Sequence, residues 1–140
     1  MINSSFLRAL TKNFPTGKYY TDPADCWVYG YDNSRRHSLP DAVIFAESHE
    51  DIVQAVKLCY EYGIPLTARG RASGTTGGAI PLKGGVVLSL ERMQKVISFD
   101  PANRIMVVEP GVLNAEVQTL AKTKGFFWPP DPTSSAYCCI

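Results

Sequence analysis

Residues 42–69 read AVIFAESHEDIVQAVKLCYEYGIPLTAR. Two short runs, residues 42–45 and 66–69, lie on either side of a segment with helical spacing and are predicted to be strands. Apolar side chains within that segment recur at i, i+3, i+4 and i+7 and are predicted to share one helix face: Ile52, Ala55, Val56 and Cys59. Ser48 is predicted to cap this helix, and Gly63 to end it. Strand, helix and strand form a βαβ unit, so the next residues lie at the carboxyl end of a strand.

The glycine-rich segment that follows is the most informative part of the chain. Six of the eleven glycines fall within sixteen residues: Gly70, Gly74, Gly77, Gly78, Gly84 and Gly85. Glycine lets backbone N–H groups converge on a ligand oxygen, and the Arg, Ser and Thr side chains of residues 69–76 add charge and donors, as a diphosphate requires. The segment lacks the G-K-[ST] of a Walker A loop and the G-x-G of a Rossmann fingerprint. On local pattern alone, a tight surface loop without a ligand is an equal alternative.

The second half of the chain predicts further strands and one more helix. Residues 86–90 are predicted to be a strand, and residues 96–100 and 105–108 a β-hairpin. A helix is predicted to follow, with Asn114 as its N-cap and an apolar face made of Val117, Leu120 and Ala121. Together with the βαβ unit, these elements predict an α+β fold.

The first forty residues give a weaker signal. Phe6, Leu7 and Leu10 predict a short amphipathic helix, whereas residues 16–36 have no clear period and are predicted to be irregular. We therefore expect residues 1–40 to form an N-terminal helix and irregular arm, and residues 41–140 to form the main domain.

Composition narrows the function classes. The 140 residues are 45% hydrophobic and 19% charged, as in one ordinary globular domain, and the formal net charge is +1. A charge so balanced argues against a nucleic-acid partner. No apolar run approaches the roughly 20 residues that cross a bilayer, and the first residues lack a secretory signal. We therefore expect no transmembrane segment and a cytoplasmic location.

The Cys and His residues do not predict a metal site. None of the four cysteines forms a C-x-x-C pair, so reduced, structural thiols are expected: Cys26, Cys59, Cys138 and Cys139. His37 and His49 have no second imidazole at ligand spacing and are expected at the surface.

Four separated blocks resemble the FAD-linked oxidases of the vanillyl-alcohol-oxidase type, and they occur in the order found in that family. The blocks are residues 65–81, 84–88, 108–112 and 128–134. Within the family they are most similar to glycolate oxidase flavoprotein subunits and D-lactate dehydrogenases. The resemblance implies an α+β, PCMH-type FAD-binding domain that holds FAD between two lobes. This chain would supply the first, βαβ-type lobe and the beginning of the second.

The resemblance also implies which residues bind FAD. The diphosphate loop of the family matches Arg69, Gly70, Arg71, Ala72, Ser73, Gly74 and Thr75. In this loop, backbone N–H groups would make most of the contacts, with help from the Ser and Thr hydroxyls. The second contact region, near the ribityl chain and the isoalloxazine, matches Pro130, Asp131, Pro132, Thr133, Ser134, Ser135 and Ala136. Asp131, Thr133 and Ser134 would be polar contacts there. The alternative is a rigid, proline-rich crossover without ligand contacts.

The loop departs from the family pattern, Arg-Gly-x-Gly-Thr, at two positions. Serine at position 73 keeps a hydroxyl where the family has threonine. Ala72 places a Cβ where the family has glycine, and a positive φ there would cost on the order of 1 kcal/mol or more. Arg71 stands where the family often has a small residue, and it either adds positive charge to the site or points to solvent.

The resemblance implies oxidation of a 2-hydroxy acid by hydride transfer to FAD. Members of the family are much longer than this chain, so we expect the chain alone to be catalytically incomplete. No catalytic base is assigned, because the remaining carboxylates are expected at the surface or in turns: Asp32, Glu47, Glu91 and Glu109. A second hypothesis keeps FAD but changes the substrate to an aryl alcohol, a sugar or a cell-wall precursor.

A further alternative is a truncated, non-catalytic module. Such a module would bind FAD or another nucleotide weakly, or would pair the open sheet edge of its second lobe with a separately encoded remainder or with itself.

Overall fold

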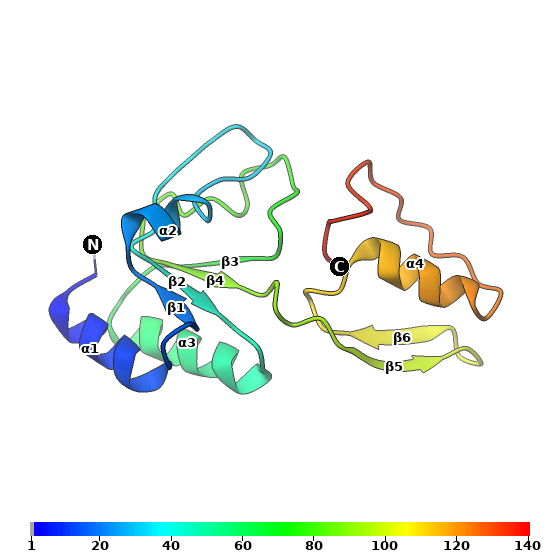
Figure 1. Cartoon of the computed structure of the whole chain (residues 1–140), viewed down its shortest axis with the longest axis horizontal. Helices are drawn as coiled ribbons and strands as arrows, with labels where there is room; N and C mark the ends of the chain where they lie inside the picture. Colours follow the sequence, from blue (N-terminus) through cyan, green and yellow to red (C-terminus); the bar gives the residue numbers. More distant parts are fainter. Residues whose placement is uncertain (1) are drawn as a thin grey trace.

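The computed structural model describes residues 2–140, which form two lobes in succession along the chain (Figure 1). The first lobe, residues 2–92, contains a four-stranded sheet with helices. The second lobe, residues 93–140, contains a two-stranded sheet and one helix. This mixed content agrees with the predicted α+β class. None of the helices within residues 2–140 is long and apolar enough to span a membrane.

The sheet of the first lobe is built on the predicted βαβ unit. Strand β2 (Ala42–Phe45) leads through helix α3 (His49–Glu61) to β3 (Leu66–Arg69), and β4 (Val86–Ser89) lies between the two strands, parallel to both. A short strand, β1 (Tyr19–Tyr20), pairs antiparallel with β2 and completes the order β1-β2-β4-β3. Every residue of β2 and β4 is buried, as expected of parallel strands covered on both faces.

An N-terminal helix contributes to the covering of each face of this sheet. Helix α1 (Ser4–Asn13) joins α3 on one face, where Phe6 and Leu10 pack with Ile44 and Leu88. The amphipathic helix predicted near the N-terminus is thereby confirmed. On the other face, Cys26 packs with Val43, Phe45 and Val87. The N-terminal residues are therefore part of the core of the first lobe.

Residues 16–36 were predicted to be irregular, and this is wrong at two short elements. One is β1, which is fixed by its pairing with β2, Tyr19 lying opposite Ile44. The other is helix α2 (Pro23–Trp27), in which Asp22 caps the N–H of Ala24. Elements of two and five residues are too short to produce a detectable period.

The side chains that helix α3 places in the core differ in part from the predicted ones. Ala55, Leu58 and Cys59 are buried, whereas Val56 is 46% exposed. Each residue adds about 100° around a helix, so Val56 lies well to one side of a face centred between Ala55 and Cys59. Ile52, as predicted, packs against this face.

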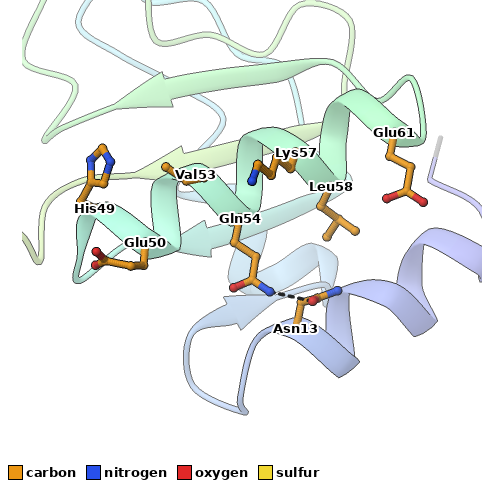
Figure 2. Close-up of a pocket in the computed structure, with 8 residues that line it drawn as sticks. All are labelled: Asn13, His49, Glu50, Val53, Gln54, Lys57, Leu58 and Glu61. Atoms are coloured by element: carbon orange, nitrogen blue, oxygen red, sulfur yellow. Dashed lines mark hydrogen bonds between the residues drawn. The ribbon is translucent and has the colours of Figure 1, made fainter.

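The outer side of α1 and α3 contains a hollow of about 530 Å³. Figure 2 shows that Gln54 of α3 reaches across to Asn13 of α1, with 2.7 Å between Nε2 and Oδ1. His49 and Glu50 lie at one end of this hollow and Glu61 at the other. The hollow lies on the helical face of the sheet, opposite the face covered by α2.

The second lobe contains the predicted hairpin of β5 (Val96–Asp100) and β6 (Ile105–Val108), followed by α4 (Asn114–Lys122). The N-cap of α4 is Leu113, so the prediction of Asn114 as N-cap is wrong. Asn114 is instead the first helical residue, and its buried side chain accepts from Trp128 Nε1 at 2.7 Å and donates to the Pro130 carbonyl at 3.1 Å. It therefore holds the segment that follows the helix.

Candidate functional site

The glycine-rich segment leaves the sheet at the carboxyl end of β3, as predicted, and returns to β4. We call residues 70–85 the loop (Figure 1, green). Within residues 2–140, the backbone N–H groups of residues 71–76 donate no hydrogen bond to the chain. A Cβ added at Gly74 would meet no atom within 4 Å, so the backbone there is open to a ligand. Unpaired N–H groups in an open turn are the donors that an anion requires.

Ala72 has a φ of +52°, in the left-handed region that disfavours a side chain. The positive φ that would strain an alanine at this position is therefore present, and it costs the folded loop on the order of 1 kcal/mol. A left-handed residue within such a turn allows successive N–H groups to face the same side, which is the geometry of an anion-binding nest.

The two arginines of the loop region have different environments. The Arg69 guanidinium is half-buried, with Nη1 3.4 Å from the Val28 carbonyl oxygen and 3.3 Å from that of Tyr31. It also lies over the Tyr29 ring, 5.1 Å from its centroid, and burial lowers the pKa of Arg69. Arg69 therefore anchors the base of the loop to residues 28–31. Arg71 is exposed and has no ion-pair partner among the described residues.

Tyr29 connects this anchor to the turn after β4. Its hydroxyl donates to Glu91 Oε1 at 3.2 Å, and its ring lies edge-on to Phe45 at 5.3 Å. Burial, with the nearby Glu91 carboxylate, raises the pKa of Tyr29 to about 12, so the hydroxyl stays a donor at neutral pH.

Asp32 was expected to be a surface or turn carboxylate; it lies at a turn, but it is buried and only 4% exposed. Its Oδ1 accepts from the Ser34 N–H at 2.8 Å, and the N–H groups of Gly77 and Ala79 also bond to the carboxylate. Burial alone would raise the pKa of Asp32, but these hydrogen bonds outweigh it and hold the pKa below the ordinary value. The sequence Asp-Asn-Ser is typical of an Asx turn, a signal that could have identified Asp32.

The second predicted segment, residues 130–136, lies over the first turn of α4. The N–H of Ala115 donates to the Ser135 carbonyl at 3.0 Å, and that of Asn114 to the Cys138 carbonyl at 3.0 Å. The start of this helix is therefore occupied by the chain itself. Asp131 and Thr133 are exposed, and Ser134 is half-buried.

The start of the loop lies beside the end of the chain, where the lobes touch. A Cβ added at Gly70 would lie 3.2 Å from both Cβ and Sγ of Cys139, which is three residues beyond the second segment. Gly111 is equally confined, since a Cβ there would lie 2.5 Å from the Leu90 carbonyl oxygen. These contacts bring the start of the loop beside the end of the chain.

The sequence of this chain is similar to that of known proteins. A family model described as FAD binding domain matches residues 40–140. The chain belongs to this family. The glycolate oxidase subunit GlcD of Bacillus subtilis is 35% identical over 108 residues, which cover 76% of this chain and 23% of that protein. A D-lactate dehydrogenase of Anaerostipes hadrus is 38% identical over 93 residues, 66% of this chain and 20% of that protein.

Solved structures confirm the PCMH-type fold. Alkyldihydroxyacetonephosphate synthase superposes with a TM-score of 0.82 at 19% identity, covering 99% of this chain and 28% of that one. For p-cresol methylhydroxylase the TM-score is 0.73 at 23% identity, with 89% of this chain and 26% of that one covered. The chain thus spans about a quarter of the length of the relatives it matches. The family match and the fold together show an FAD-binding domain over residues 40–140.

The residues present fit the diphosphate of FAD. Unpaired N–H groups, the half-buried Ser73, the exposed Thr75 and Thr76 and the exposed Arg71 are suited to an anion, and Arg69 steadies the base of the loop. Two of the thiols have a structural role: burial raises the pKa of Cys26 and of Cys59 to about 11, so both stay protonated at neutral pH. His37 and His49 are exposed, as expected.

Proposed function

We propose that this chain supplies the diphosphate-binding part of an FAD-dependent enzyme that oxidises a small 2-hydroxy acid, similar to glycolate or D-lactate. The observation that carries this proposal is the open run of N–H groups at residues 71–76, placed at the carboxyl end of a parallel strand. The substrate class is supported by relatives named glycolate oxidase subunit, D-lactate dehydrogenase and D-2-hydroxyglutarate dehydrogenase.

The chain's own residues bind and orient the cofactor, which when bound supplies the hydride acceptor. Backbone N–H groups of Gly70, Ser73, Gly74 and Thr75 donate to the diphosphate, and Arg71 adds a positive charge. Arg69 fixes the base of the loop through its guanidinium, and Ala72 fixes the turn through its backbone conformation. In the second segment, Asp131, Thr133 and Ser134 offer polar groups toward the flavin half, while Pro130 and Pro132 stiffen the path of Ser135 and Ala136.

The second lobe indicates where the rest of the flavin domain packs. A groove of about 510 Å³ between the hairpin and α4 is lined by Phe99, Met106, Val117, Phe127, Trp128 and Ile140. Phe127 is 70% exposed. We propose that this groove is covered by the part of the flavin domain that the chain does not span. That part would also supply the catalytic base. The cytoplasmic location expected from the sequence stays a prediction.

Titration of the purified chain with FAD, followed by flavin fluorescence and melting temperature, tests the proposal. FAD is expected to raise the melting temperature, and Arg71→Ala to weaken binding about three- to tenfold through loss of one exposed charge contact. Arg8→Ala on α1 is the matched control, because it removes an exposed arginine far from the loop. If saturating FAD shifts the melting temperature of neither the natural chain nor Ala72→Gly, the proposal fails.

A further inference from the structure

Residues 28–38 are the last part of the N-terminal arm expected from the sequence, and from here on only they are called the arm. They contact the loop along much of its length. The backbone N–H of Asn33 donates to the Gly74 carbonyl at 3.0 Å, and its side-chain Nδ2 donates to the Ser73 carbonyl at 3.1 Å. Further along, Ser38 Oγ donates to the Pro81 carbonyl at 2.8 Å. One residue of the arm, Asn33, thus holds two successive carbonyl groups of the loop.

These two bonds determine where the loop's N–H groups point. In a trans peptide unit the C=O and the following N–H point in opposite directions, and the described chain has no cis peptide bond. Asn33 draws the carbonyls of Ser73 and Gly74 toward the arm. The N–H groups of the same two units, those of Gly74 and Thr75, therefore face away from the arm, on the open side of the loop.

Asp32 binds N–H groups of the loop, where Asn33 binds carbonyl groups, and its partners lie two and four residues beyond Thr75. Its buried carboxylate accepts from the N–H groups of Gly77 and Ala79, so this end of the loop turns its donors inward. The adjacent residues Asp32 and Asn33 thereby divide the loop into a part with outward donors and a part that is fastened to the arm. The carboxylate itself lies below the surface, away from the open side.

We propose that Asn33 is a positioning residue of the nucleotide site, which orients the N–H groups of Gly74 and Thr75 toward a diphosphate before the ligand arrives. The inference rests on the function proposed above and deepens it. Without the Asn33 side chain, the Ser73–Gly74 peptide unit regains rotational freedom that must be lost again on binding, so affinity falls although no direct contact is removed. Because Asn33 is exposed, its loss leaves the core intact.

The test compares Asn33→Ala with Asn103→Ala. Asn103 is also exposed and also makes two hydrogen bonds, both to Asp100 in the hairpin turn of the other lobe. ADP is the probe, because it carries the diphosphate without the flavin. We expect Asn33→Ala to weaken ADP binding about tenfold, as measured by calorimetry, while Asn103→Ala binds like the natural chain. Both variants should melt within a few degrees of it.

Backbone ¹⁵N relaxation of the ligand-free chain gives a readout that a merely structural role would not change. The order parameter of Gly74 should fall in Asn33→Ala, and that of Thr75 should fall less, because the backbone N–H of residue 33 still bonds to the Gly74 carbonyl; those of β3 should stay unaltered. If the natural chain binds ADP and Asn33→Ala binds it equally well, the positioning role is wrong and the proposed function stands. If the natural chain binds neither ADP nor FAD, the proposed function is wrong, and the positioning role falls with it.

Discussion

The two lobes support their strands and their candidate cofactor segments in different ways. In the first lobe, β2 and β4 are wholly buried, and the loop is fastened by Arg69 and by the arm. In the second lobe, neither β5 nor β6 has a buried residue, and residues 130–133 are exposed. The comparison shows that the first lobe has a buried core of its own, whereas the strands of the second lobe leave their side chains partly or fully exposed.

The largest expected effect is on the free energy of unfolding, and it distinguishes the sheet of the first lobe from that of the second. Leu88→Ala in β4 and Ile105→Ala in β6 remove the same number of atoms, but Leu88 is 3% exposed and Ile105 is 54% exposed. We expect the free energy of unfolding to fall by about 2–4 kcal/mol for Leu88→Ala and by less than about 1 kcal/mol for Ile105→Ala. Urea unfolding measures both. Equal losses would show that β6 is buried in solution and would refute the comparison.

The next effect separates two aspartates, one in the arm that holds the loop and one in the second candidate segment. Asp32→Asn should lower the free energy of unfolding by about 1–3 kcal/mol, because an amide places a donor against N–H groups that need an acceptor. Asp131→Asn is the matched control: Asp131 is exposed, so this change should have little effect. Urea unfolding at pH 7 measures both, and a stable Asp32→Asn chain would contradict the role given to Asp32.

The same variant predicts a pH dependence. Because the folded-state pKa of Asp32 lies below its unfolded value, its stabilising contribution is complete above the unfolded pKa, about 3.9, and is lost as pH falls through the folded pKa. The stability difference between the natural chain and Asp32→Asn should therefore shrink as pH falls below about 4. Unfolding curves at a series of pH values measure it, and a difference that grows toward acid pH would reverse the assignment.

A smaller effect compares two alanines within the loop. Ala72→Gly should raise the free energy of unfolding by about 1 kcal/mol, since glycine adopts the observed φ of +52° without strain. Ala79→Gly, where φ is not positive, should lower it by about 0.5–1 kcal/mol through the added freedom of the unfolded chain. Opposite signs in thermal unfolding are the expected result. Equal signs would show that Ala72 is not left-handed in solution.

Much of the fold could be predicted because it rests on local patterns. The period of residues 52–59 and the runs on either side sufficed for the βαβ unit, and that unit places the loop at a strand end. The hairpin followed from two short apolar runs around a turn. Val56 was misplaced because the apolar period alone does not show which edge of a helix face meets the sheet.

The support of the loop could not be predicted, because it depends on contacts between distant residues. Asn33 and Ser73 are 40 positions apart, and Arg69 and Val28 are 41 apart. The sequence Asp-Asn-Ser indicates a turn at Asp32, but it does not indicate that the carboxylate is buried or that it binds the N–H groups of Gly77 and Ala79. Asn114 was misassigned for the same reason, since its partners Trp128 and Pro130 lie beyond the helix. The local sequence predicts helices and strands, whereas tertiary contacts determine the hydrogen-bond partners of the polar side chains.

The smallest expected effect on stability concerns the open edge of the second lobe. Strand β6 pairs only with β5 among the described residues, so its other edge offers free backbone groups beside the apolar groove. The chain is therefore expected to self-associate as concentration rises. Val107→Lys, at a position that is 44% exposed, should suppress association while changing stability by no more than about 0.5 kcal/mol.

Sedimentation velocity over a concentration series measures this, with Thr119→Lys on α4 as the control that adds the same charge elsewhere in the lobe. Association that survives Val107→Lys but not Thr119→Lys would move the contact to the helix. A natural chain that stays monomeric throughout would show that the groove and the β6 edge tolerate water. The proposed covering of the groove would then serve catalysis and not folding.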